Sequence, residues 1–122
     1  MGLNVINMAL IPAFLGYGIF WVIRRVLPAN RSGVLAATAT AALASVVLAS
    51  VMFTIEYAIG GNGAAPIETV GAAMIGVHVL IGIGEAIIST LTVAAVLNTR
   101  PDLVYGARDL PRVQAPRVAV AA

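Results

Sequence analysis

The sequence contains no cysteine, no lysine and few charged residues of any kind. Without cysteine there is no disulfide framework, no thiolate metal site and no cysteine nucleophile. Charged residues make up 10% of the 122 positions, against about 25% in an ordinary soluble domain. Because so few charges cannot cover a water-soluble surface, a soluble enzyme and a disordered regulator are both poor hypotheses.

Positive charge is also too sparse for a nucleic-acid binder. The formal net charge is +2, and all seven basic residues are arginines confined to two stretches, 24–31 and 100–117. A nucleic-acid interface needs a broad basic surface that can neutralise many phosphates. We therefore expect no nucleic-acid partner.

The chain does contain long hydrophobic runs, and 61% of its residues are apolar. A helix needs about 20 apolar residues to cross the roughly 30 Å of hydrocarbon in a bilayer. Three runs are long enough, and only His78 and Glu85 interrupt the third. The sequence thus predicts an all-α integral membrane protein whose three transmembrane helices form part of a larger helical bundle. We expect a membrane domain over residues 1–106, with helices at about 5–25, 33–56 and 68–98.

The arginines predict how these helices lie in the membrane. Three of them separate the first and second spans and four follow the third, whereas the 56–69 connection has Glu56 and Glu68 but no basic residue. The positive-inside rule then predicts a multi-pass protein of the cell membrane with its N-terminus outside and its C-terminus in the cytoplasm. Residues 107–122, rich in proline and arginine, are expected to be a disordered cytoplasmic tail.

His78 and Glu85 are the ionisable residues predicted to lie within the membrane. They are seven residues apart, so they share nearly the same face of a helix. Such groups are costly to insert and usually face a bundle interior or a water-filled path, which makes both candidates for an ion or proton route. Alternatively, His78 lies near the outer interface and Glu85 bonds to another helix in a structural role. One His and one Glu do not make a metal site, since a transition metal takes four or more ligands.

Two asparagines and many small residues indicate further contacts. Asn4 and Asn7 are three residues apart and share a helix face, where they line a polar cavity or cap the helix. Small side chains let helices approach closely when lipid removes the hydrophobic drive for association. More of them are present than three helices can bury, so we expect additional helices from a partner or from a missing part of the same protein. They include Ala36, Ala37, Ala41, Ala44 and Ser45 in the second span and Gly71, Gly76, Gly82, Gly84 and Ala86 in the third.

Two stretches of the chain resemble a known family. Residues 2–10, Gly-Leu-Asn-Val-Ile-Asn-Met-Ala-Leu, and residues 76–103, which include Gly-Val-His-Val-Leu-Ile-Gly-Ile-Gly-Glu and end in Arg-Pro-Asp-Leu, are similar to the CbiM/NikM family. Members of this family are the cobalt and nickel substrate-capture components of energy-coupling factor ABC transporters. The first stretch resembles the middle of the full-length family protein and the second resembles its last helix, so the resemblance is to the C-terminal half only.

The resemblance implies uptake of Co²⁺ or Ni²⁺, driven by ATP hydrolysis on separate ATPase subunits and coupled through a transmembrane T subunit. The cobalt branch of the family supplies cobalamin biosynthesis. The family's metal ligands lie in an N-terminal Met-His segment and in a later histidine segment, and no position of this chain corresponds to them. The resemblance therefore implies a non-enzymatic chain without metal ligands or a cofactor of its own. Asn4, Asn7, His78 and Glu85 are carried over as positions that support the site or the coupling surface.

We accordingly expect a C-terminal fragment, the product of a misplaced start codon, or one piece of a split protein whose separately encoded N-terminal half supplies the ligands. Two other classes remain open. One is a small proton-coupled transporter, although three spans with the Glu in the last do not match its usual organisation. The other is a non-catalytic membrane assembly subunit without a ligand.

Overall fold

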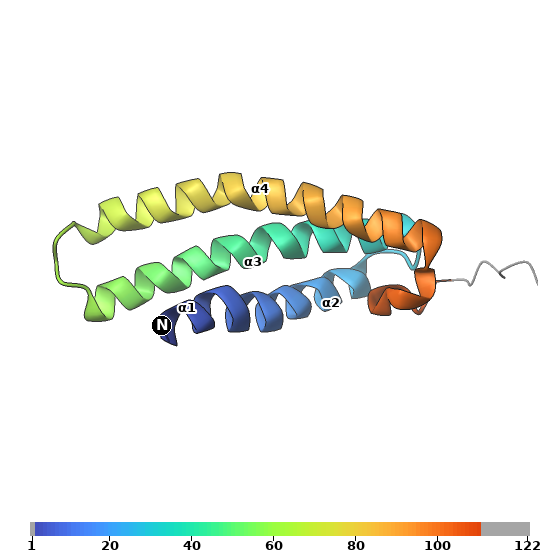
Figure 1. The fold of residues 1–122 in the computed structure, drawn as a ribbon, viewed down its shortest axis with the longest axis horizontal. Helices are drawn as coiled ribbons and strands as arrows, with labels where there is room; N and C mark the ends of the chain where they lie inside the picture. Colours follow the sequence, from blue (N-terminus) through green and yellow to red (C-terminus); the bar gives the residue numbers. More distant parts are fainter. Residues whose placement is uncertain (1, 111–122) are drawn as a thin grey trace, which may run out of the picture.

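The structure, a computed structural model, describes residues 2–110 and contains three long helices that run side by side (Figure 1). All three are long and apolar enough to cross a membrane, which confirms the predicted all-helical, three-span fold. The first helix covers residues 2–26 and is followed by α3, Arg31–Gly60, and α4, Ile67–Thr99. Within the first helix the elements are α1 (Gly2–Val5), η1 (Ile6–Leu10), η2 (Pro12–Gly16) and α2 (Tyr17–Val26), and after α4 come η3 (Pro101–Leu103) and η4 (Tyr105–Ala107).

Helix α3 lies between the other two helices, as Figure 1 shows. Small residues at the buried positions of α3 explain this arrangement, since they allow close approach. On one side a Cβ added at Gly16 of the first helix would lie 3.2 Å from the Cβ atom of Ser45. On the other side a Cβ at Gly82 of α4 would lie 3.1 Å from the carbonyl oxygen of Leu43. The first helix and α4 therefore each pack on α3.

The start of α3 follows from its local sequence. Asn30 is the N-cap, and its side-chain oxygen accepts a hydrogen bond of 2.8 Å from the backbone N–H of Gly33. This bond satisfies one of the donors that a helix N-terminus leaves free. Gly33 is buried, and a Cβ there would collide with the carbonyl of Pro28. The turn over residues 28–33 therefore leads directly into α3, with Asn30 as its N-cap.

The connection between α3 and α4 is shorter than the sequence suggested. It comprises residues 61–66, because α3 continues four residues beyond the expected end at 56, and Glu56 and Glu68 both lie within helices. The Tyr57 hydroxyl donates to the carbonyl of Ala65 at 3.0 Å and accepts from its N–H at 3.1 Å. Gly63 adopts a φ of 70°, which favours glycine. These contacts fix a tight turn between two antiparallel helices.

The first helix contains wide π-type turns around Pro12. In η1 the N–H of Ile11 bonds to the carbonyl of Ile6, five residues earlier. Proline lacks an N–H, so it removes one regular bond from the helix, and the local distortion takes the form of these turns. π-type turns are frequent at functional sites, and Asn7 lies within η1.

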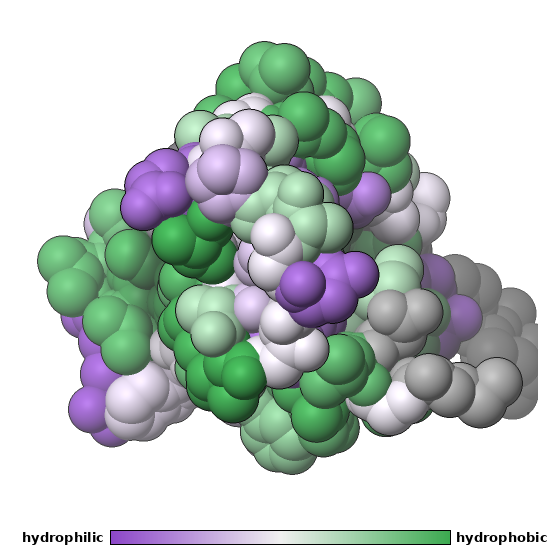
Figure 2. Space-filling view, turned by 90° about the vertical axis from the view of Figure 1, so that its left-hand side faces the viewer, coloured by the Kyte–Doolittle hydropathy of each residue, from purple (hydrophilic) through white to green (hydrophobic). Residues whose placement is uncertain are grey.

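Most of the surface is apolar. Many large hydrophobic side chains are exposed, among them Met8, Phe14 and Leu80. Figure 2, which looks at the end carrying residues 61–66, shows hydrophobic residues over most of the outline. An exposed apolar surface of this extent fits helices surrounded by lipid or by further helices.

The chain beyond α4 turns back against α2. Asp109 forms an ion pair with Arg24, and Ala107 is buried. The predicted tail over 107–122 therefore begins with residues that pack on α2, while 111–122 lie outside the described residues. We call this end of the molecule the arginine end, because it carries Arg24, Arg25, Arg31, Arg100 and Arg108.

Candidate functional site

A polar pair joins the first helix to α3 near the end opposite the arginines. The Asn7 side-chain nitrogen, Nδ2, donates a hydrogen bond of 2.6 Å to the Glu56 carboxylate oxygen Oε2. Asn7 is 8% exposed and Glu56 is half-buried. A hydrogen bond to a carboxylate is stronger than one between neutral groups. The pair therefore holds the start of the first helix against the last turns of α3.

The other polar atom of Asn7 has no partner. Its Oδ1 is buried and accepts no hydrogen bond from the part of the chain that the structure describes. An unsatisfied buried acceptor costs about 1–3 kcal/mol, so this oxygen favours any donor or cation that reaches it. The Glu56 carboxylate beside it supplies further oxygen ligands, and hard or borderline cations bind such atoms.

Asn4, the companion of Asn7 in the sequence analysis, lies one turn earlier in α1. Its side chain is outside the described part of the structure. The structure thus places Asn4 on the same helix as Asn7, and its role stays a prediction.

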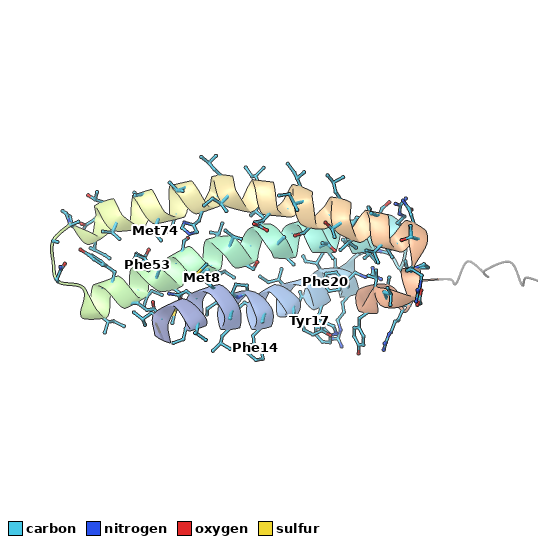
Figure 3. The ribbon with its side chains drawn as sticks, in the orientation of Figure 1. Met8, Phe14, Tyr17, Phe20, Phe53 and Met74 are labelled. Carbon is cyan, nitrogen blue, oxygen red and sulfur yellow. The ribbon has the colours of Figure 1, made fainter. Side chains whose placement is uncertain are left out.

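His78 lies on the side of α4 that packs against α3. It is seven residues after Gly71 and four before Gly82, both of which contact α3. Its Nδ1 is 2.7 Å from the carbonyl oxygen of Met74. Because a carbonyl can only accept, Nδ1 carries the proton, and Nε2 is left for another partner. His78 itself is half-buried. Met74 itself is labelled on α4 in Figure 3.

The structure does not bring His78 together with the Asn7–Glu56 pair. Gly71 lies against Thr54 and Gly82 against Leu43, so eleven residues of α4 match eleven of α3 in antiparallel register. This register puts His78 level with Val47. Glu56 is nine residues further along α3, an axial separation of about 13 Å at 1.5 Å per residue.

Glu85 is exposed, in contrast to His78. It lies near the middle of α4, and among residues 2–110 its carboxylate has no hydrogen-bond or ion-pair partner. A carboxylate at this depth is costly to leave in hydrocarbon. His78 and Glu85 therefore lie in different environments although they are seven residues apart. His78 lies at the contact with α3, and Glu85 lies on the outer surface.

The sequence analysis did not select Glu56, because it placed this residue at the very end of the second span, where the connection to the third begins. A signal was available in the spacing. Glu56 is eleven residues after the buried Ser45, and eleven residues correspond to about three helical turns. Extending the buried row of α3 by three turns would have placed Glu56 on the side that contacts the first helix.

The glycines of α4 divide into two groups. A Cβ at Gly71 or Gly82 would lie within 3.4 Å of α3, so these two provide the close approach that the sequence predicted. A Cβ at Gly76 or Gly84 would meet nothing within 4 Å in the described chain. Gly76 and Gly84 therefore leave small-residue surface on α4 that α3 does not use, and Gly84 is adjacent to Glu85.

Comparison with known proteins identifies the family. The family model described as CbiM, cobalt uptake substrate-specific transmembrane region, matches residues 1–103. The chain belongs to the CbiM family. No curated protein and no solved structure gave a match. The CbiM match confirms the resemblance at family level and makes the chain a multi-pass membrane component of cobalt uptake.

CbiM membership also settles the general class of activity. A CbiM protein is the substrate-binding membrane component of a transporter and not an enzyme, in agreement with the sequence analysis. Cobalt is its substrate, and the family belongs with the partner subunits of energy-coupling factor transporters. Within residues 2–110 no three His, Cys, Asp or Glu side chains lie close enough together to hold a metal ion.

Proposed function

We propose that this chain is the C-terminal part of the substrate-capture component of an ATP-driven cobalt or nickel importer, and that the metal ligands come from another segment. The observation that carries the proposal is the CbiM match over residues 1–103. The arrangement of side chains supports it, because it offers oxygen atoms at one end and a carboxylate on the outer face. It does not offer a complete ligand set among the described residues.

The Asn7–Glu56 pair is the polar part that this chain would contribute to the path of the metal. Its position at the end opposite the arginines is the outer end if the positive-inside rule holds. The unpartnered Asn7 Oδ1 and the Glu56 carboxylate are oxygen ligands that a partly hydrated divalent ion can contact in passing. In this proposal the pair supports the missing ligands, and Asn4 lies next to it.

Glu85 is proposed to face a partner helix. Its carboxylate is exposed at mid-helix. At Gly84, the preceding residue, an added Cβ would meet no atom of the described chain within 4 Å, so a partner helix has room to approach here. A partner helix from the transmembrane coupling subunit would remove the carboxylate from lipid and give it a donor. The ATPase subunits would then act through that coupling subunit on the cytoplasmic side.

The missing ligands give the first test. Calorimetric titration of the purified chain with Co²⁺ or Ni²⁺ should show no binding beyond that of nonspecific sites, because a transition-metal site needs four or more ligands. The same titration of the chain joined to, or mixed with, the segment that supplies the ligands should show stoichiometric binding. Submicromolar, stoichiometric binding by the chain alone would overturn this part of the proposal.

The partner subunits give the second test. A tagged chain extracted from native membranes in mild detergent should carry the coupling subunit and the ATPases with it. A chain that purifies free of both, from cells that contain them, would favour the assembly subunit without a ligand that the sequence left open.

A further inference from the structure

A pocket of about 370 Å³ lies at the arginine end, between the last turns of α2 and the short turn η4. Aromatic rings form much of its wall, namely Tyr17, Phe20 and Trp21 from α2 and Tyr105 from η4. Figure 3 labels Tyr17 and Phe20 on α2, and Figure 1 shows the turns that follow α4 beside the end of this helix. A Cβ at Gly106 would come well inside 3.0 Å of the Phe20 ring, so glycine permits this close approach.

Three guanidinium groups and one carboxylate line the same pocket. Arg24 is already engaged, since it pairs with Asp109 and donates to the carbonyl of Pro28 at 3.1 Å. Its side chain is 8% exposed. This pair ties η4 and the residues after it to α2, and it leaves the charges of Arg25 and Arg108 uncompensated within residues 2–110.

Arg25 and Arg108 are each oriented by a ring. The guanidinium carbon of Arg25 lies 3.5 Å from the Trp21 ring centroid, and that of Arg108 lies 4.1 Å from the Tyr105 centroid. Stacking uses the face of a guanidinium group, whereas its N–H donors point outward in the plane. Neither residue donates these hydrogens to an acceptor in the described chain. The pocket therefore contains two guanidinium groups that are oriented by stacking and whose N–H donors are free to bind a ligand.

The pocket lies at the level where a membrane-spanning helix meets the headgroups. Arg24 and Arg25 follow directly on the uncharged run of the first helix, and Trp21 is one turn before Arg25. Tryptophan and tyrosine concentrate at this boundary. Val22 and Val26, on the side of the same helix turned away from the pocket, are 53% and 80% exposed, so the helix still carries apolar surface at this level.

From this combination we infer that the pocket binds the phosphate of an anionic phospholipid headgroup, held by Arg25 and Arg108 against the aromatic wall. Arginine matches the geometry of phosphate oxygens with pairs of N–H donors, and basic pockets between membrane helices bind anionic headgroups. The place of the pocket at the end of a helix able to span a membrane, with Trp21 and Tyr105 in its wall, favours a lipid over free phosphate, because these residues concentrate at the headgroup level. The inference concerns the arginine end alone and does not depend on metal transport.

Native mass spectrometry of the full chain in detergent, offered equal amounts of phosphatidylglycerol and phosphatidylcholine, tests the inference. We expect the wild type to retain phosphatidylglycerol preferentially. Replacing both stacked arginines, Arg25→Ala with Arg108→Ala, should weaken this retention at least about tenfold. Each lost charge-assisted contact is worth more free energy than a tenfold change in the binding constant requires. Circular dichroism of the variant checks that its helix content is unchanged.

The chain offers a matched control with the same change in net charge. Arg31 donates only to the carbonyl of Ala94, at 3.4 Å, and Arg100 is paired with Asp102 at 2.8 Å. Both belong to the arginine end but neither lines the pocket. Arg31→Ala with Arg100→Ala should leave phosphatidylglycerol retention near the wild-type value. Equal losses in the two double variants, or equal retention of the two lipids by the wild type, would overturn the inference.

The single tryptophan distinguishes the sources of phosphate. Trp21 fluorescence should change when a short-chain phosphatidylglycerol is titrated into the wild type and should not change with inorganic phosphate. Displacement of the lipid by millimolar inorganic phosphate would assign the pocket to free phosphate and not to a lipid. Loss of partner subunits from the Arg25→Ala, Arg108→Ala variant, without lipid bound to the wild type, would assign it to a protein contact. Either result contradicts the inference.

Discussion

Asn7 and Glu56 form the one side-chain hydrogen bond between the first helix and the last turns of α3 in the described chain. Glu56→Ala removes the acceptor and leaves the buried Asn7 amide without any partner. We expect the free energy of unfolding in mixed micelles to fall by about 1–3 kcal/mol. Because removing both partners can be nearly neutral, Asn7→Leu with Glu56→Leu should recover much of the loss.

Glu68→Ala is the control for this prediction. Glu68 is exposed in the first turn of α4 and has no hydrogen-bond partner among residues 2–110. Its favourable interaction with the helix dipole is worth about 0.3–1 kcal/mol. An equal loss of stability in the two single variants would show that the Asn7–Glu56 bond contributes nothing specific.

At Glu85 we expect transport and stability to respond differently. Glu85→Gln should leave the free energy of unfolding of the isolated chain within about 0.5 kcal/mol of the wild type, because the side chain is exposed and has no hydrogen-bond or ion-pair partner among residues 2–110. Uptake of radiolabelled cobalt by cells with the complete transporter should fall about tenfold if a hydrogen bond to a charged group in the complex is lost. Glu68→Gln serves as the uptake control, and unchanged uptake with Glu85→Gln would leave Glu85 without a coupling role.

At the scale of helices, the contact between α3 and α4 depends on which glycine is changed. Gly82→Val adds a branched side chain at a position where even a Cβ would lie 3.1 Å from the backbone carbonyl oxygen of Leu43. Overpacking of this kind costs about 1–3 kcal/mol, and the same unfolding titration measures it. Gly84→Val is the matched control, since nothing in the chain lies within 4 Å of that position. It should leave the isolated chain stable and reduce co-purification of the coupling subunit.

Sequence patterns predict the helices well and their packing poorly, for a physical reason. The three apolar runs are long enough to span a membrane, and this length alone is enough to predict the spans. The end of the second span was placed too early, at residue 56, because Glu56 ends the uncharged run, whereas α3 continues to Gly60. The central position of α3 could not be predicted, because α3 and α4 are apolar on all sides and carry no stripe that marks a packed face.

The same reasoning explains the outcome at the candidate site. His78 and Glu85 stand out in a sequence because ionisable residues in an apolar run are rare. Their environments depend on the register of α4 against α3, which Gly71 and Gly82 set and which no single-helix pattern contains. Asn7 was found from its polarity, but its partner is 49 residues away in the sequence. Only the fold brings the two together.

For the molecule as a whole, the distribution of arginine predicts the orientation in the membrane. The chain has no native cysteine, so single substitutions can be labelled without interference. Asn62→Cys, in the connection between α3 and α4, should react with a membrane-impermeant maleimide in intact cells. Ser32→Cys, at the start of α3, should react only after the cells are opened. The reverse pattern would place the arginine end outside.

The central claim is that this CbiM chain takes part in ATP-driven cobalt import, and uptake of radiolabelled cobalt tests it most directly. Cells with the ATPase and coupling subunits should accumulate cobalt when the chain is present and lose this uptake when it is deleted. Inactivating the ATPases should abolish the uptake, whereas the proton gradient should not drive it. Uptake that persists without the chain, or that depends on the proton gradient and not on ATP hydrolysis, would contradict the account.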